Sequence, residues 1–163
     1  MGTGSIVEYT QVWWSVRPHF SFGTVEVRIC DAQSTAQESE ALAALITACV
    51  AQAARDEDEG VPFEDPARRL IEENVWRAVR YGMDGRLIDL GRACETPAAE
   101  ALEGLFRWTA PMRAELGLDP QLPALNGAQR QRRAIDAGAS MEEVYASSVR
   151  ETRQTYAQEV PAA

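Results

Sequence analysis

The stretch that decides the fold lies near the start of the chain, where residues 12–31 read VWWSVRPHFSFGTVEVRICD. Its two β-rich runs, joined by a turn, predict a β-hairpin. Successive side chains of a strand point to opposite faces, so Glu26 and Arg28 share one face and the alternating valines share the other. If Arg17 pairs with Thr24 across the turn, Arg17 joins Glu26 and Arg28 on the charged face.

The charged face of this hairpin has a composition that suits anion chemistry. A carboxylate between two guanidinium groups can hold a metal ion and phosphate oxygens together. In the same register Trp13 falls opposite Arg28, so its ring can lie over the guanidinium as a cation–π partner. The alternative interpretation is an exposed strand face with ordinary charge pairs, which contribute little to stability.

Composition limits the possible partners and compartments. The chain has 163 residues, of which 45% are hydrophobic, and its formal net charge is −9. This length predicts one domain or part of one, and the negative charge argues against nucleic acid or an anionic membrane as the main partner. Three widely spaced cysteines, with no signal peptide or membrane-spanning run, predict a soluble cytoplasmic protein with reduced thiols.

The remainder of the chain predicts mainly helices, so the fold class is α+β, with strands in residues 1–31 and helices across 32–163. The first expected helix begins with a capping box at Ser34 and Gln37 and ends before the acidic run 56–60, and the second runs from Asp65-Pro66 to Tyr81. A third begins after Thr96-Pro97 and is broken at Pro111. A short helix is expected over 128–137, and a last one begins with a capping box at Ser140 and Glu143. A short extended piece is expected at 86–90. Because two strands make a marginal sheet, the pattern indicates the later part of a larger domain.

Three segments in order carry a family resemblance. They are the hairpin stretch 13–31, the run EENVWRAVRYG at residues 72–82, and NGAQRQR at residues 126–132. Together they resemble the glutamate–cysteine ligase type 2 family, also called carboxylate–amine ligases. The resemblance covers almost the whole chain but only the C-terminal part of a typical member, and Ser15 stands where members often carry Asp.

The resemblance implies a glutamine-synthetase-like fold, here a fragment with an antiparallel hairpin or sheet backed by helices. It implies ATP- and Mg²⁺-dependent ligation of glutamate or a similar carboxylate with cysteine or another amine, through an acyl phosphate. Carried over, Glu26 resembles a metal-binding carboxylate, Arg28 a contact for the transferring phosphoryl group or substrate carboxylate, and Arg17 a nucleotide-phosphate contact. The sequence has no GxxxxGK[ST] phosphate loop, which fits ATP bound on a sheet instead.

The second resembling run adds candidate cofactor contacts. Asn74 and Arg77 fall on one stripe of the expected helix, with Arg80 beside it. We expect nucleotide or substrate binding from these three side chains, and the alternative is a polar helix face with a Glu73–Arg77 pair. The arginines at 130, 132 and 133 are expected to form a solvated helix face, with phosphate contact as the alternative.

Two other functions remain open from the sequence. The chain can be a non-catalytic interaction module that self-associates through exposed strand edges into a homo-oligomer. It can also be another phosphotransferase on the same fold, since fold analogy does not fix the reaction.

Overall fold

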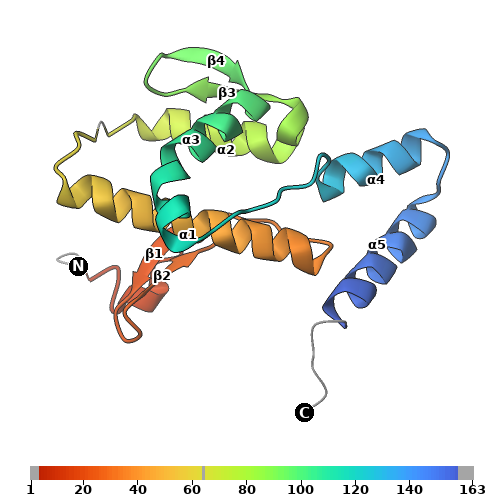
Figure 1. Cartoon of the computed structure of the whole chain (residues 1–163), viewed down its shortest axis with the longest axis horizontal. Coiled ribbons are helices and arrows are strands. Elements are labelled where there is room, and N and C mark those ends of the chain that lie inside the picture. The colour runs from red at the N-terminus through yellow and green to blue at the C-terminus, as the bar shows by residue number, and fades with distance from the viewer. Residues whose placement is uncertain (1–3, 64, 158–163) are drawn as a thin grey trace. The chain divides into compact units, whose positions relative to one another are not determined.

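The computed structural model describes residues 4–63 and 65–157. The chain divides into two compact units, Met1–Ala32 and Gln33–Ala163, and each is described by itself. Figure 1 shows the elements in chain order: a 3₁₀ turn (Tyr9–Gln11), β1 (Val16–His19), β2 (Thr24–Val27), α1 (Ala36–Asp58), α2 (Arg68–Tyr81), a 3₁₀ turn (Gly82–Asp84), β3 (Arg86–Asp89), β4 (Cys94–Pro97), α3 (Ala98–Leu116), α4 (Gly127–Asp136) and α5 (Met141–Tyr156). The described helices and two small antiparallel sheets confirm the α+β class.

The first unit contains the expected hairpin, β1 paired antiparallel with β2. The predicted register was wrong, because Arg17 pairs with Glu26 and His19 pairs with Thr24. The loop is shorter than expected: the Phe22 N–H donates to the His19 carbonyl, and Gly23 closes the loop at φ +62° in the left-handed region that glycine tolerates. The shift is two residues, so every side chain keeps its predicted face.

The second unit is built on α1, which packs against α3 and α5. Its N-terminal box uses Thr35 and Glu38, one residue later than the predicted pair Ser34 and Gln37. The buried line along α1 includes Ala41, Leu45 and Ala48, with Ala48 fully buried. Two alanines in this line let the neighbouring helix approach closely.

Several helix ends differ from the sequence prediction. Helix α1 continues to Asp58, so the acidic run begins within its last turn. Helix α2 begins at Arg68, later than Asp65-Pro66 suggested, and ends as expected before Gly82. Helix α3 continues through Pro111. Thr109 and Met112 on either side of this proline are buried, so tertiary packing offsets its missing N–H.

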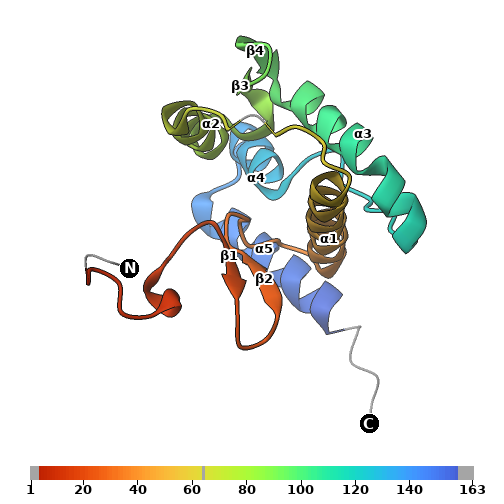
Figure 2. The same ribbon diagram turned by 90° about the vertical axis from the view of Figure 1, so that its left-hand side faces the viewer.

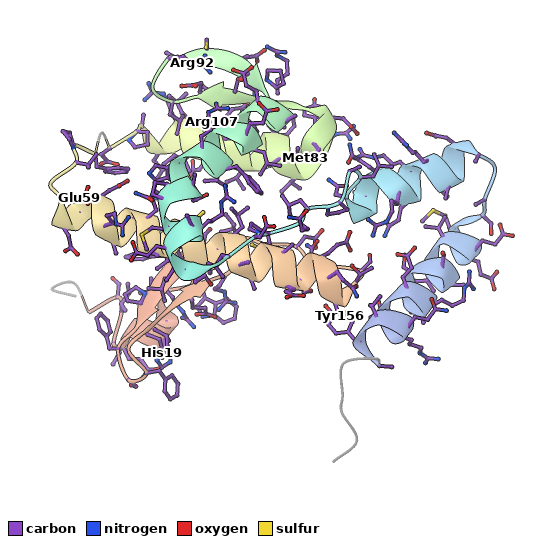
Figure 3. The ribbon with its side chains drawn as sticks, in the orientation of Figure 1. His19, Glu59, Met83, Arg92, Arg107 and Tyr156 are labelled. Carbon is purple, nitrogen blue, oxygen red and sulfur yellow. The ribbon has the colours of Figure 1, made fainter. Side chains whose placement is uncertain are left out.

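A second hairpin, β3–β4, was predicted only in part. The extended piece at 86–90 is β3, but its partner β4 covers residues expected to lead directly into a helix. Leu87 pairs with Thr96, and the turn is held by the Asp89 carboxylate, which accepts from the Arg92 N–H at 2.8 Å. Figure 3 shows Arg92 at the tip of this hairpin.

Helices α4 and α5 complete the second unit and pack on each other, as both ribbon views show (Figures 1 and 2). Capping boxes begin both helices, at Asn126 with Gln129 and at Ser140 with Glu143, and the second of these was predicted. The Tyr156 hydroxyl lies 2.5 Å from that of Ser39, which joins the end of α5 to the first turn of α1 (Figure 3). Among the described residues, no helix has the length and apolar character needed to cross a membrane.

Candidate functional site

The charged face of the β1–β2 hairpin brings together the three residues singled out from the sequence. Arg17 and Glu26 lie directly opposite each other, and Nε of Arg17 donates to Oε2 of Glu26. Nη1 of Arg28 donates to Oε1 of the same carboxylate at 3.3 Å. The hydrogen bond from Arg17 is the main cause that lowers the pKa of Glu26, so this carboxylate is charged at neutral pH.

The two arginines of this face differ in how many donors remain for a ligand. Nη1 of Arg17 donates to the backbone carbonyls of Thr10 at 2.9 Å and Val12 at 3.0 Å, and its side chain is 14% exposed. The Arg28 side chain is 34% exposed, and its only side-chain hydrogen bond within the described part of the chain goes to Glu26. Arg17 is therefore mostly engaged in holding the backbone, while Arg28 presents most of its donors to solvent.

The cation–π contact expected on this face is present. The guanidinium carbon of Arg28 lies 4.8 Å from the ring centroid of Trp13, so the prediction that these two side chains meet is confirmed. The contact forms although the register differs from the predicted one and the Arg28 N–H bonds the Ser15 carbonyl.

The net charge of this face favours anionic oxygens over a bare cation. Two guanidiniums and one carboxylate sum to +1, and both Glu26 oxygens already accept from an arginine. Residues 4–63 and 65–157 contain no group of three or more histidine, cysteine, aspartate or glutamate side chains that could hold a metal ion. By itself this set therefore does not form a Mg²⁺ centre, although Glu26 can supply one of its oxygen ligands.

The candidate residues on α2 belong to the second unit, whereas the hairpin group belongs to the first. Nδ2 of Asn74 donates to the Ile88 carbonyl at 2.8 Å, and its Oδ1 accepts from the Ile88 N–H at 2.7 Å. The Asn74 side-chain amide thus bonds both the N–H and the carbonyl of Ile88, as the backbone of a neighbouring strand would, and it fixes α2 against β3. Asn74 thus has a structural role in addition to any ligand contact.

The two candidate arginines of α2 differ in the same way as those of the hairpin. Arg77 donates to Glu73 at 2.8 Å and to Glu95 on β4 at 2.6 Å, and these carboxylates raise its pKa. Arg80 is exposed, and its guanidinium lies 5.5 Å from the ring centroid of Tyr81. Within the described residues Arg80 has no carboxylate partner. Of the α2 candidates, Arg80 is the one whose charge is open to a ligand.

One arginine of the third resembling run has a role that sequence reasoning missed. Arg130 was expected on a solvated face, but its Nη1 donates to Glu38 at 2.6 Å and to the Leu125 carbonyl at 2.8 Å. The same guanidinium lies 3.7 Å from the Glu151 carboxylate, so it links α4 with α1 and α5. The signal that could have revealed this role is Glu38, which in the structure forms the capping box with Thr35 and is buried in the first turn of α1.

Comparisons with known proteins agree with the resemblance found in the motifs. The family model described as "Glutamate-cysteine ligase family 2 (GCS2)" matches residues 1–152. A relative in Solibacter usitatus is 35% identical over 157 residues, covering 92% of this chain and 41% of the relative. A second in Gloeobacter violaceus is 38% identical over 151 residues, covering 88% of this chain and 41% of the relative. Each relative carries the name "Putative glutamate--cysteine ligase 2", and the chain spans about two fifths of their length.

Proposed function

Because the chain belongs to glutamate–cysteine ligase family 2, we propose that it supplies part of the active site of an ATP- and Mg²⁺-dependent carboxylate–amine ligase. The γ-phosphoryl group of ATP passes to a carboxylate of glutamate or a similar acid, giving an acyl phosphate and ADP. The amine of cysteine or another amino compound then attacks the acyl carbon, phosphate leaves, and an amide remains. The observation that carries this proposal is the Arg17–Glu26–Arg28 face of the hairpin.

The chemistry of phosphoryl transfer explains what this face contributes. The protein has little covalent work to do in such a reaction and acts by positioning and neutralising negative charge. Arg28 would bind oxygens of the transferring phosphoryl group or of the substrate carboxylate, since most of its N–H groups face solvent. The remaining amino group of Arg17 would reach a nucleotide phosphate. Bound Mg²⁺ would supply charge neutralisation between phosphate oxygens, with Glu26 as one ligand.

We propose the three α2 residues as nucleotide contacts, of which Arg80 is free to bind directly while Asn74 and Arg77 also hold the fold. Arg80 is open to solvent and suits a phosphate oxygen directly. Asn74 and Arg77 would act while also holding α2 to the β3–β4 hairpin, since their side chains are already bonded there. All three cysteines of the chain are free thiols, which supports a reducing, cytoplasmic setting.

The experiment that tests this function measures ADP release by the purified chain with Mg·ATP, glutamate and a panel of amines that includes cysteine. We expect amine-dependent release that is lost in Glu26→Gln. The matched control is Glu72→Gln, which changes an exposed carboxylate on α2 whose only ion pair among the described residues is with Arg68, four residues away. Because the chain spans two fifths of its relatives, Mg·ATP binding by calorimetry is measured in parallel. Wild-type protein that neither binds Mg·ATP nor releases ADP refutes the proposal for this chain.

A second candidate function rests on the reverse face of the hairpin. Trp14, Val16, Val25 and Ile29 are between 48% and 65% exposed, an apolar surface that favours association. In this alternative the chain is an interaction module that forms a homo-oligomer through its strand edges. Sedimentation velocity distinguishes the two: a module self-associates, binds no Mg·ATP and tolerates Glu26→Gln, whereas Val25→Arg dissociates it.

A further inference from the structure

We propose that Trp13 is a positioning residue that holds the Arg28 guanidinium in its ligand-binding orientation, and that Arg17 in turn holds Trp13. This inference rests on the proposed function for the ligand that Arg28 binds, but the positioning itself is a statement about three side chains of one hairpin. All residues that make these contacts belong to the first unit.

The contact with Trp13 restricts the orientation of the Arg28 guanidinium together with Glu26. A guanidinium that is 34% exposed and has one hydrogen bond of 3.3 Å can rotate about most of its side-chain torsions. The ring of Trp13, 4.8 Å from the guanidinium carbon, restricts this rotation from one side, while the Glu26 carboxylate restricts it from another. The remaining N–H groups of Arg28 make no hydrogen bond within the described part of the chain, so they are left for a ligand.

Arg17 explains why Trp13 lies where it does. Nη1 of Arg17 binds the carbonyls of Thr10 and Val12, the second of which belongs to the residue directly before Trp13. Its Nε binds the Glu26 carboxylate that also binds Arg28. Arg17 therefore connects the backbone that carries Trp13 to the carboxylate that orients Arg28, and its side chain is only 14% exposed.

Ordinary packing does not account for Trp13 at this position. The residue is 76% exposed, so it buries little apolar surface within the chain, and its contact with a guanidinium is its aromatic interaction among the described residues. Trp14 is comparably exposed at 65% but has no cation–π contact in the described part of the chain. The two neighbouring tryptophans therefore form a matched pair in which only one is placed to orient an arginine.

The test follows the Nε–H resonance of Arg28 by NMR in protein labelled with ¹⁵N-arginine. A ring above the guanidinium shields its protons, so we expect an upfield Arg28 signal that returns to the normal range in Trp13→Leu and is largely retained in Trp13→Phe. Arg17→Gln should move the signal as Trp13→Leu does. Trp14→Leu is the control and should leave the signal in place.

Titration with Mg·ATP then measures the consequence for binding. Loss of an exposed cation–π contact should weaken binding by about two- to fivefold in Trp13→Leu. Trp13→Phe should recover most of the loss, and Trp14→Leu should bind as wild type does. The positioning role is refuted if Arg28 resonates at the same place in wild type and Trp13→Leu, or if both proteins bind Mg·ATP with the same measurable affinity. A ring-dependent Arg28 signal in a protein that binds no Mg·ATP instead refutes the proposed function, so the two failures are distinct.

Discussion

Replacement of Arg130 with alanine is the most informative single change in the second unit. The guanidinium donates to Glu38 on α1 and to the Leu125 carbonyl ahead of α4, and it lies near Glu151 on α5. The Glu38 side chain is only 7% exposed. Without Arg130, Oε1 of this buried carboxylate loses its hydrogen-bond donor, while Oε2 keeps its bonds from Thr35.

The magnitude is set mainly by the hydrogen-bonded ion pair with Glu38, the most buried of the three interactions that are lost. Removing one partner of a fully buried ion pair costs about 3–5 kcal/mol, and a hydrogen bond to a charged group contributes about 1.5–3 kcal/mol. Arg130 is 31% exposed, so water can partly replace it and the lower range applies. We expect Arg130→Ala to reduce the free energy of unfolding by about 2–3 kcal/mol.

Urea denaturation followed by circular dichroism measures this loss. Arg133→Ala is the matched control, because it removes an exposed arginine from the same helix and should change stability by less than about 0.5 kcal/mol. A double-mutant cycle with Glu38→Gln isolates the pair itself, and we expect a coupling free energy of at least about 1 kcal/mol. An Arg130→Ala variant as stable as Arg133→Ala would show that this arginine does not link the three helices.

Three further predictions concern stability. Asn74→Ala should reduce the free energy of unfolding by about 2–3 kcal/mol, because it removes the hydrogen bonds to both the N–H and the carbonyl of Ile88. Thermal and urea unfolding measure this loss. The bond from Arg130 lowers the pKa of Glu38 in the folded protein, so its stabilising contribution is complete above the unfolded value near pH 4.3 and is lost as the pH falls through the folded value. A stability profile below pH 5 that is equally steep in wild type and Glu38→Gln would contradict this. Gly117→Ala should cost about 1–2 kcal/mol, because residue 117 ends α3 at φ +65°, and an unchanged melting temperature would argue against that conformation.

The sequence predicted which side chains share a face of the first hairpin but not how the strands pair. Faces depend on parity alone, so Glu26 and Arg28 were placed together correctly even though Arg17 pairs two residues away from its expected partner. The register depends on the loop, where a left-handed Gly23 allows a tighter turn than the pattern suggested. Parity can be read along one segment, whereas loop geometry is a property of the folded backbone.

The strand β4 was missed because its residues imitate a helix start. Thr96 and Pro97 precede a strong helical pattern and are typical of a cap, yet Thr96 pairs with Leu87 and is buried. The cue that identifies the strand is the turn before it, where Asp89 binds the backbone of Arg92. In this hairpin, turn chemistry was the more reliable signal.

The residues of the candidate site could be predicted from the sequence, but not which of them are free for a ligand and which are engaged in holding the fold. Sequence assigned ligand contacts to Arg17 and Arg28 alike. The structure separates them, because the carbonyls of Thr10 and Val12 engage Arg17 and no sequence pattern marks a backbone oxygen as an arginine partner. The same difference separates Arg77, bonded to Glu73 and Glu95, from the solvent-exposed Arg80.

The charge balance of the hairpin yields a final prediction that separates two effects of Glu26. Its carboxylate neutralises one of two guanidiniums, and Glu26→Gln raises the charge of the face from +1 to +2 while the amide oxygen can still accept from Arg17. Removal of the Glu26 negative charge should strengthen binding of ATP without metal, because the carboxylate repels phosphate and the two guanidiniums attract it. The same variant should lose the additional affinity that Mg²⁺ confers if Glu26 is a metal ligand. In calorimetric titrations, Glu26→Gln should therefore raise the affinity for ATP in EDTA and lower the affinity for Mg·ATP, each relative to wild type. If both affinities fall together, Glu26 acts by holding the hairpin, and its role as a metal ligand is refuted.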